Sequence, residues 1–228
     1  MMSDYSKEEL TKNKFLPVIG VLARNIQNGI GFEGSIPWKC KLDMKIFKAL
    51  TTNSIMIMGR KTLESLPKVL DSENRASICL TKKDYEELNT LKTKYPTVMF
   101  TNKTNIADIE NEAKLFFDKR FDNKLCFTVI GGTKTIQALD DDISALFLST
   151  IDDTSLCDTR FENGDFIYDR VAMIATPMFN DLTNYKTMEV FVKEGIFTYD
   201  FRDTVNNRII GHRITEVKRL LDNHCVLN

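Results

Sequence analysis

Short apolar runs, separated by polar or helix-like segments, recur along most of this chain. The first, residues 15–23, reads FLPVIGVLA and is nearly continuous, as expected of a strand covered on both faces. Similar runs occupy residues 54–58, 76–80, 97–101, 127–130 and 145–151. Two later runs, residues 171–178 and 187–193, follow a loop with Asn163 and Gly164, and we expect them to form an antiparallel edge. This alternation predicts an α/β fold with a mainly parallel central sheet flanked by helices.

The polar segments divide the chain into three parts. Residues 1–14 form a polar leader, residues 15–194 hold the predicted sheet and its helices, and residues 195–228 form a C-terminal extension. The leader lacks the apolar stretch of a signal peptide, and no later run is long enough to span a bilayer. The five cysteines are scattered and never approach a C-x-x-C spacing. We therefore expect a cytoplasmic protein with no metal site and no membrane partner.

The sequence also predicts a long loop after the first strand and a helix in the C-terminal extension. Residues 24–37 (RNIQNGIGFEGSIP) are rich in Asn and Gly, which is typical of a loop long enough to cover a site. In the extension, the pattern predicts a strand at 196–201 and then an amphipathic helix. One face of that helix carries Ile214, Val217, Leu220 and Leu221. Because an exposed apolar stripe is a liability, this face should dock on the protein's own core or on a second copy, so either a monomer or a dimer follows.

Charge excludes one class of partner. Lys and Arg number 31 against 32 Asp and Glu, for a formal net charge of -1. A protein that neutralises a nucleic-acid backbone carries a basic excess, so we expect no nucleic-acid partner. Any positive charge that matters must be local, as a small phosphorylated cofactor would require.

Asp43 is the candidate for acid–base chemistry. Residues 41–50 (KLDMKIFKAL) have a helical pattern whose polar face carries Lys41, Lys45 and Lys48. Asp43 instead shares the apolar face with Phe47 and Leu50, four and seven residues later. It either caps the start of the helix or is a buried acid whose pKa is raised toward neutrality. The only histidines, His212 and His224, lie in the extension, so the core offers no imidazole.

Three strand ends are candidates for binding phosphate. The run 54–58 leads into Gly59-Arg60-Lys61-Thr62, and the run 127–130 leads into Gly131-Gly132-Thr133-Lys134-Thr135. Free backbone N–H groups at the following helix start would favour phosphate, although a glycine there also suits a simple tight turn. A third basic end, Leu80-Thr81-Lys82-Lys83, would suit the 2′-phosphate of NADPH, or is only a solvated charge run.

These segments together resemble dihydrofolate reductase. The resemblance covers residues 18–194 and rests on ordered blocks rather than on a single motif. The blocks are Ile30-Gly31, Ile36-Pro37-Trp38, Asp43 with Phe47, residues 57–62, Arg75, Leu80-Thr81, residues 129–132, residues 148–151 and residues 157–161. The family's fold is a central, mainly parallel eight-stranded sheet flanked by helices, to which the extension is an addition.

The resemblance also implies the site and the reaction. NADPH would pass a hydride to C6 of 7,8-dihydrofolate, giving tetrahydrofolate for one-carbon metabolism, and Asp43 would hold the pterin and assist protonation of N5. Arg75 would clamp the glutamate carboxylate of the substrate. Other substrate-binding positions would be Ala23, Ile30, Ile36, Trp38, Met44, Phe47, Leu66, Leu70, Ile130 and Ser149. Cofactor-binding positions would be Ala23, Ile30, Gly59, Arg60, Lys61, Thr62, Leu80, Thr81, Lys82, Ile130, Gly131, Gly132, Thr133, Lys134, Thr135 and Ile136.

The chain departs from the family pattern in a few places, and two alternatives stay open. Leu63 stands where many relatives have an aromatic residue, Ile136 stands where a tyrosine is frequent, and two extra residues separate Leu70 from Arg75. A reductase of another heterocycle, of the riboflavin-pathway pyrimidine reductase type, would share the fold. A non-catalytic nucleotide-binding regulator is the second alternative. A dihydrofolate reductase, and with it an antifolate target, is the prediction that explains most of the motifs.

Overall fold

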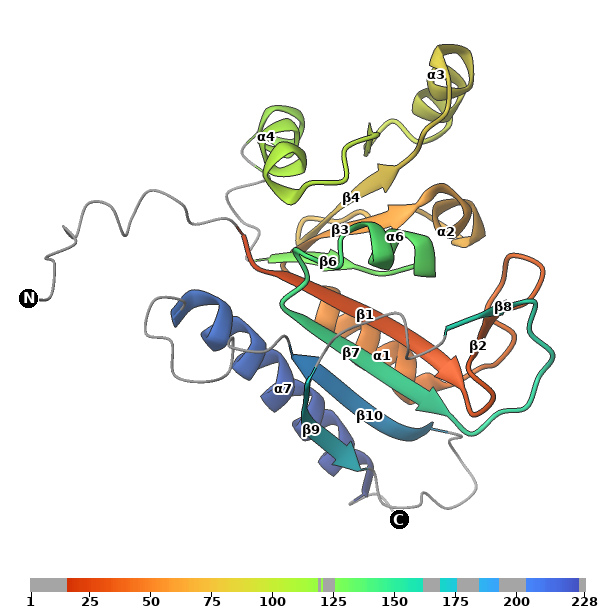
Figure 1. Cartoon of the computed structure of the whole chain (residues 1–228), viewed down its shortest axis with the longest axis vertical. Coiled ribbons are helices and arrows are strands. Elements are labelled where there is room, and N and C mark those ends of the chain that lie inside the picture. The colour runs from red at the N-terminus through yellow and green to blue at the C-terminus, as the bar shows by residue number, and fades with distance from the viewer. Residues whose placement is uncertain are drawn as a thin grey trace, which may run out of the picture.

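The computed structural model describes residues 16–118, 120, 126–161, 169–175, 185–192 and 204–225 (Figure 1). Its centre is an eight-stranded sheet in the order β5-β4-β3-β6-β1-β7-β10-β9. The strands are β1 (Val18–Asn25), β3 (Ser54–Gly59), β4 (Arg75–Leu80), β5 (Val98–Thr101), β6 (Cys126–Val129), β7 (Ala145–Ile151), β9 (Asp169–Ala175) and β10 (Tyr185–Val192). All pairs from β5 to β7 are parallel, and β10 runs antiparallel to both β7 and β9. The predicted fold class is confirmed.

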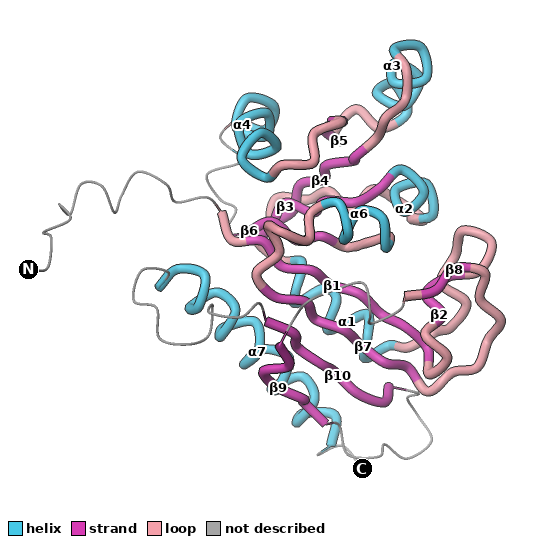
Figure 2. Tube along the Cα trace, in the orientation of Figure 1, coloured by secondary structure: helices cyan, strands magenta, loops and turns pink. Residues whose placement is uncertain are grey.

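Helices cover the sheet on both faces, which explains why the strands are apolar throughout (Figure 2). The helices are α1 (Lys41–Thr51), α2 (Arg60–Ser65), α3 (Tyr85–Lys94), α4 (Ile106–Phe117), α6 (Thr133–Ala138) and α7 (Thr204–Cys225). Along β1, Val18 and Leu22 point into a core cluster shared with α4 and α6. Ile19 and Val21 point into a second cluster, shared with α1 and α7. Alternate residues of one strand therefore bury opposite faces.

The segment 24–37 contains more regular structure than its composition predicted. β1 continues to Asn25, and β2 (Gly29–Gly31) pairs with β8 (Thr159–Arg160) in a small antiparallel sheet. The Asn25 carboxamide oxygen accepts from the backbone N–H of Gly29 at 2.7 Å, which closes the turn. Composition alone missed this pairing because the two strands are about 130 residues apart in sequence, as the hydrogen bond from Arg160 Nη1 to the Gln27 carbonyl at 2.6 Å illustrates.

The predicted amphipathic helix of the extension is present as α7 and docks on the protein's own core. Val217 and Leu221 are buried in the cluster that holds Leu42 and Ile46 of α1. Figure 1 shows α1 and α7 together on the far face of the sheet. The strand predicted at 196–201 lies outside the described residues. Within the described part of the chain, no helix is long and apolar enough to cross a membrane.

We expect Leu221→Ala to lower the free energy of unfolding by about 2–4 kcal/mol, because it removes a buried side chain and leaves a cavity between α7 and α1. Leu115→Ala is the matched control, since Leu115 is 87% exposed, and it should change stability by less than about 0.5 kcal/mol. Urea unfolding of both variants measures the difference. Equal stabilities would mean that α7 does not contribute to the core in solution.

Candidate functional site

A cleft of about 1600 Å³ opens at the carboxyl ends of the central parallel strands. It runs from α1, past the ends of β1, β6 and β3, to the ends of β4 and β5. Because the helices that connect parallel strands cross back over the faces of the sheet, the carboxyl ends of neighbouring strands lie at the same edge. Open α/β sheets bind their ligands at that edge. The volume is sufficient for two ligands of moderate size placed end to end.

Asp43 lies in the first turn of α1 and forms part of the cleft lining. Cys40 is the N-cap residue and makes no side-chain capping bond, whereas Asp43 lies inside the helix with only 9% of its surface exposed. Burial raises the pKa of Asp43 to about 6, and a hydrogen bond with the Ser149 side chain opposes part of that rise. The structure therefore favours the buried acid over the helix cap.

Trp38 lies just before α1 and is 6% exposed. Its indole Nε1 is buried and has no hydrogen-bond partner among the described residues. An unsatisfied buried N–H costs about 1–3 kcal/mol, so this donor is suited to an acceptor that a ligand or its water brings in.

The two glycine turns predicted from sequence lie side by side, because β3 and β6 are neighbours in the sheet. The Gly59 N–H donates to the Gly131 carbonyl at 3.2 Å, and Gly131 and Gly132 are joined by a cis peptide bond. A Cβ on Gly59 would lie 2.8 Å from Thr135 Oγ1, and Gly131 has a φ of 126°, so both positions require glycine. The close backbone forms a cradle that a side chain would fill, which fits a pyrophosphate group.

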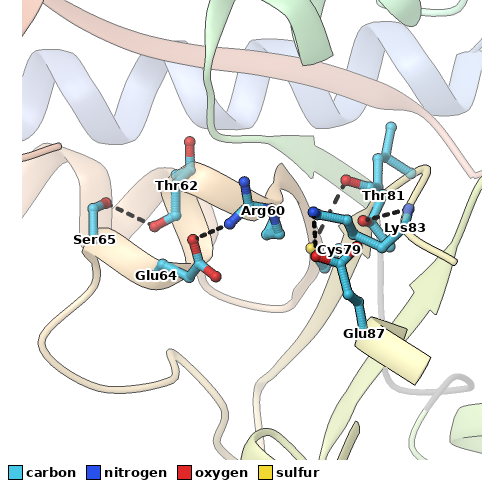
Figure 3. A network of polar contacts seen from close by, with 9 residues as sticks. Arg60, Thr62, Glu64, Ser65, Cys79, Thr81, Lys83 and Glu87 are labelled. Atoms are coloured by element: carbon cyan, nitrogen blue, oxygen red, sulfur yellow. Dashed lines mark hydrogen bonds and ion pairs between the residues drawn. The ribbon is translucent and has the colours of Figure 1, made fainter. Parts of the chain in front are cut away.

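The third basic strand end follows β4, and because the sheet order is β4-β3-β6, the three ends form a row. Figure 3 shows two of them, with Arg60 and Thr62 after β3 and Thr81 and Lys83 after β4. Arg60 Nη1 pairs with Glu64 at 2.6 Å, and Lys83 Nζ pairs with Glu87 at 2.5 Å. Lys82 is exposed and forms part of the cleft lining. Its ammonium group is thus placed to meet an additional phosphate at the edge of the cleft.

Most of the residues predicted for the two ligands line this one cleft. They are Ala23, Ile30, Ile36, Asp43, Met44, Phe47, Gly59, Arg60, Lys61, Thr62, Leu66, Leu70, Leu80, Thr81, Lys82, Ile130, Gly131, Gly132, Thr133, Lys134, Thr135 and Ser149. The cleft also contains Asn102, Lys103 and Thr104, which were not predicted. They follow the apolar run of β5, so the strand-end rule that found the other three segments applies to them too.

Three predicted residues lie elsewhere. Ile136 belongs to α6 and is fully buried in the core cluster that α6 shares with α4, so its side chain does not line the cleft. Trp38 is buried in the second core cluster and is not among the lining residues. Arg75 lies at the start of β4, half-buried, with Nη2 donating to the Lys48 carbonyl at 3.1 Å. Leu63, the other side chain that differs from the family pattern, is 1% exposed and packs in a third core cluster. Both departures therefore affect the core rather than the cleft lining.

The fold and the cleft define an α/β protein with a phosphate-binding region that adjoins a buried carboxylate. A family model described as dihydrofolate reductase matches residues 17–174. Dihydrofolate reductase type 9 of Escherichia coli is 35% identical over 142 residues, which is 62% of this chain and 74% of that protein. Dihydrofolate reductase of Staphylococcus aureus is 43% identical over 61 residues, covering 27% of this chain and 37% of the relative.

A solved structure supports the same assignment. Dihydrofolate reductase from Enterococcus faecalis, complexed with NADP(H) and RAB-propyl, superposes with a TM-score of 0.55 at 25% identity. The match covers 78% of this chain and 96% of that one. The chain belongs to the dihydrofolate reductase family.

We expect Asp43→Asn to stabilise the fold at pH 8 by about 3 kcal/mol, since ionising a buried group whose pKa lies about two units high costs 1.36 kcal/mol per unit. The folded-state pKa is raised, so this cost is absent below about pH 4, grows between about pH 4 and pH 6, and is constant at higher pH. Urea unfolding at pH 4 and pH 8 measures it, with Asp108→Asn, at an exposed position of α4, as the control. A difference from wild type that is the same at both pH values would contradict the burial of an ionisable Asp43.

Proposed function

We propose that this protein reduces 7,8-dihydrofolate to 5,6,7,8-tetrahydrofolate with NADPH, and that Asp43 is its catalytic carboxylate. The observation that carries the proposal is the position of Asp43: a buried acid at one end of a cleft whose other end holds three phosphate-suited strand ends. Family membership and the likeness to an NADP(H)-bound reductase support the same reaction.

The cofactor end of the cleft is assigned to residues that surround the glycine cradle. Backbone N–H groups near Gly131 and Gly132 and at the start of α2 hold the pyrophosphate, and Thr62 and Thr135 flank it. Lys82 with Thr81 meets the 2′-phosphate that distinguishes NADPH from NADH. When bound there, NADPH supplies the hydride.

The substrate end of the cleft is assigned to α1 and the end of β7. Asp43 accepts hydrogen bonds from the pterin amino and ring N–H groups, and its raised pKa allows it to assist protonation of N5 near neutral pH. Ser149 holds the carboxyl group in position, and Trp38 Nε1 donates to water or substrate at this end. Met44, Phe47 and Leu66 provide apolar walls for the pterin and the ring that follows it.

Arg75 is assigned to the glutamate tail of the substrate. Its guanidinium uses one nitrogen, Nη2, on the Lys48 carbonyl, and a planar guanidinium keeps further N–H donors for a carboxylate. Desolvation lowers the pKa of Arg75, which marks a partly buried cation rather than a fully solvated one. A carboxylate that reached it would bind in a partly desolvated setting.

The reaction is tested by following NADPH oxidation at ~340 nm with dihydrofolate. Asp43→Asn keeps the side-chain shape, removes the ionisable group, and should lower kcat/KM by a factor of about 10² to 10⁴ at pH 7. The loss should shrink at low pH, where the substrate arrives already protonated. Asp108→Asn is the control and should match wild type.

An inactive wild-type protein that still bound NADPH would overturn the substrate assignment. The alternative reductase of a riboflavin-pathway pyrimidine would then be tested with its own substrate in the same assay. Activity with neither substrate would favour the regulatory alternative.

Cofactor choice is tested separately. Lys82→Met should raise the KM for NADPH about tenfold and leave the KM for NADH unchanged, because the lost charge faces only the 2′-phosphate. Lys92→Met, on the exposed last turn of α3, is the matched control. Equal effects on both cofactors would place the 2′-phosphate elsewhere.

We also propose the cellular compartment and the oligomeric state of the protein. Cys40, Cys79, Cys126 and Cys157 are buried free thiols, which suits the reducing cytoplasm. Because α7 packs its apolar face on the protein's own core, we assign a monomer in which residues 15–194 carry the reaction and residues 195–228 are a stabilising extension. Dihydrofolate and NADPH are its small-molecule partners.

A further inference from the structure

The end of α1 is held by two arginines from distant parts of the chain. Arg213 of α7 is 6% exposed, and its Nη1 and Nη2 donate to the carbonyls of Ala49 and Thr52, both at 2.6 Å. Arg75 Nη2 donates to the Lys48 carbonyl of the same turn. The last carbonyls of a helix have no partner within the helix, and the negative end of its dipole favours cations, so both contacts stabilise this end of α1.

Arg213 is anchored more firmly than a surface arginine. Its Nη2 also lies 3.8 Å from Cys126 Sγ in β6, so the guanidinium touches the sheet as well as α1. Val217, one helical turn further along α7, is fully buried in the cluster that includes Leu42 and Ile46 of α1. A buried guanidinium that bonds to fixed carbonyls costs little further entropy and defines their position closely.

Both ends of α1 contribute to the proposed substrate site. Asp43 is in its first turn, and its last turn supplies the carbonyl on which Arg75 rests. A displacement of the last turn therefore moves the Arg75 guanidinium, whereas the phosphate-binding strand ends lie on other elements. Arg213 should thus affect the binding of the substrate tail more than the binding of cofactor.

We propose that Arg213 is a positioning residue for substrate: by fixing the last turn of α1, the C-terminal helix holds Arg75 in place to bind the glutamate carboxylate of dihydrofolate. This rests on the proposed function, and it gives the extension a role in substrate affinity in addition to stability. Arg213 itself touches no substrate.

The test compares two substrates in the NADPH oxidation assay: dihydrofolate, and 7,8-dihydrobiopterin, which has the pterin but no glutamate tail. Arg213→Met should raise the KM for dihydrofolate about tenfold, leave that for dihydrobiopterin within about twofold, and leave NADPH affinity unchanged. Arg219→Met is the matched control, because Arg219 is an exposed arginine of the same helix paired with Glu216. It should leave every constant at the wild-type value.

A double-variant cycle separates positioning from a general loss of stability. In an Arg75→Met background, Arg213→Met should add no further rise in the KM for dihydrofolate, because the group that it positions is already gone. Additive effects, or an equal rise for both substrates, would overturn the proposal. If Arg213→Met does not fold, Arg213→Lys replaces it: a rise smaller than tenfold but confined to dihydrofolate supports the proposal, and no difference between the substrates overturns it.

The two proposals fail in different ways. Wild-type protein that does not reduce dihydrofolate ends both. Wild-type protein that reduces dihydrofolate, together with an Arg213→Met variant of unchanged KM, retains the reductase and removes only the role of Arg213.

Discussion

The structure depends on the parallel pairing of its central strands. Parallel strands need crossover connections, those connections cover both faces with helices, and the carboxyl ends of neighbouring strands then lie at one edge. In this chain the order β4-β3-β6-β1 brings together four segments that are scattered over more than one hundred residues of sequence. The strand order alone therefore places the glycine turns and the basic segments together at the cleft.

The same arrangement explains how an acid can be kept out of water at little cost to the rest of the fold. Asp43 is on a helix whose apolar face packs on the sheet through Leu42, Ile46 and Leu50, each almost fully buried. The packing of these residues offsets the cost of desolvating one carboxylate. The unfavourable burial of the Asp43 carboxylate is thus combined with close packing of apolar side chains on the same helix, as is common at functional sites.

Sequence reasoning was strongest where the pattern was local. The strand runs, the glycine turns and the apolar setting of Asp43 all depend on residues close together in the chain, and the structure brings them to the cleft. The role of a residue was harder to predict where its side chain binds backbone groups that are far away in the sequence. Arg213 binds carbonyls more than 160 positions earlier, and no spacing rule connects a lone arginine with the end of another helix. The cofactor contact predicted for Ile136 came from a family position and not from a local pattern, and the side chain itself fills the core.

The small sheet formed by β2 and β8 ties one border of the cleft to a distant part of the chain. Glu33 and Ser35 border the cleft, and the Glu33 N–H donates to the Asp158 carboxylate at 2.7 Å. The Asp158 N–H in turn donates to the Gly31 carbonyl at 3.0 Å. Any outward movement of this border has to break those bonds or carry residues 157–161 with it. These bonds hold two segments that are 125 residues apart in sequence together as one border of the cleft, so a substitution that removes one of the bonds affects the position of both.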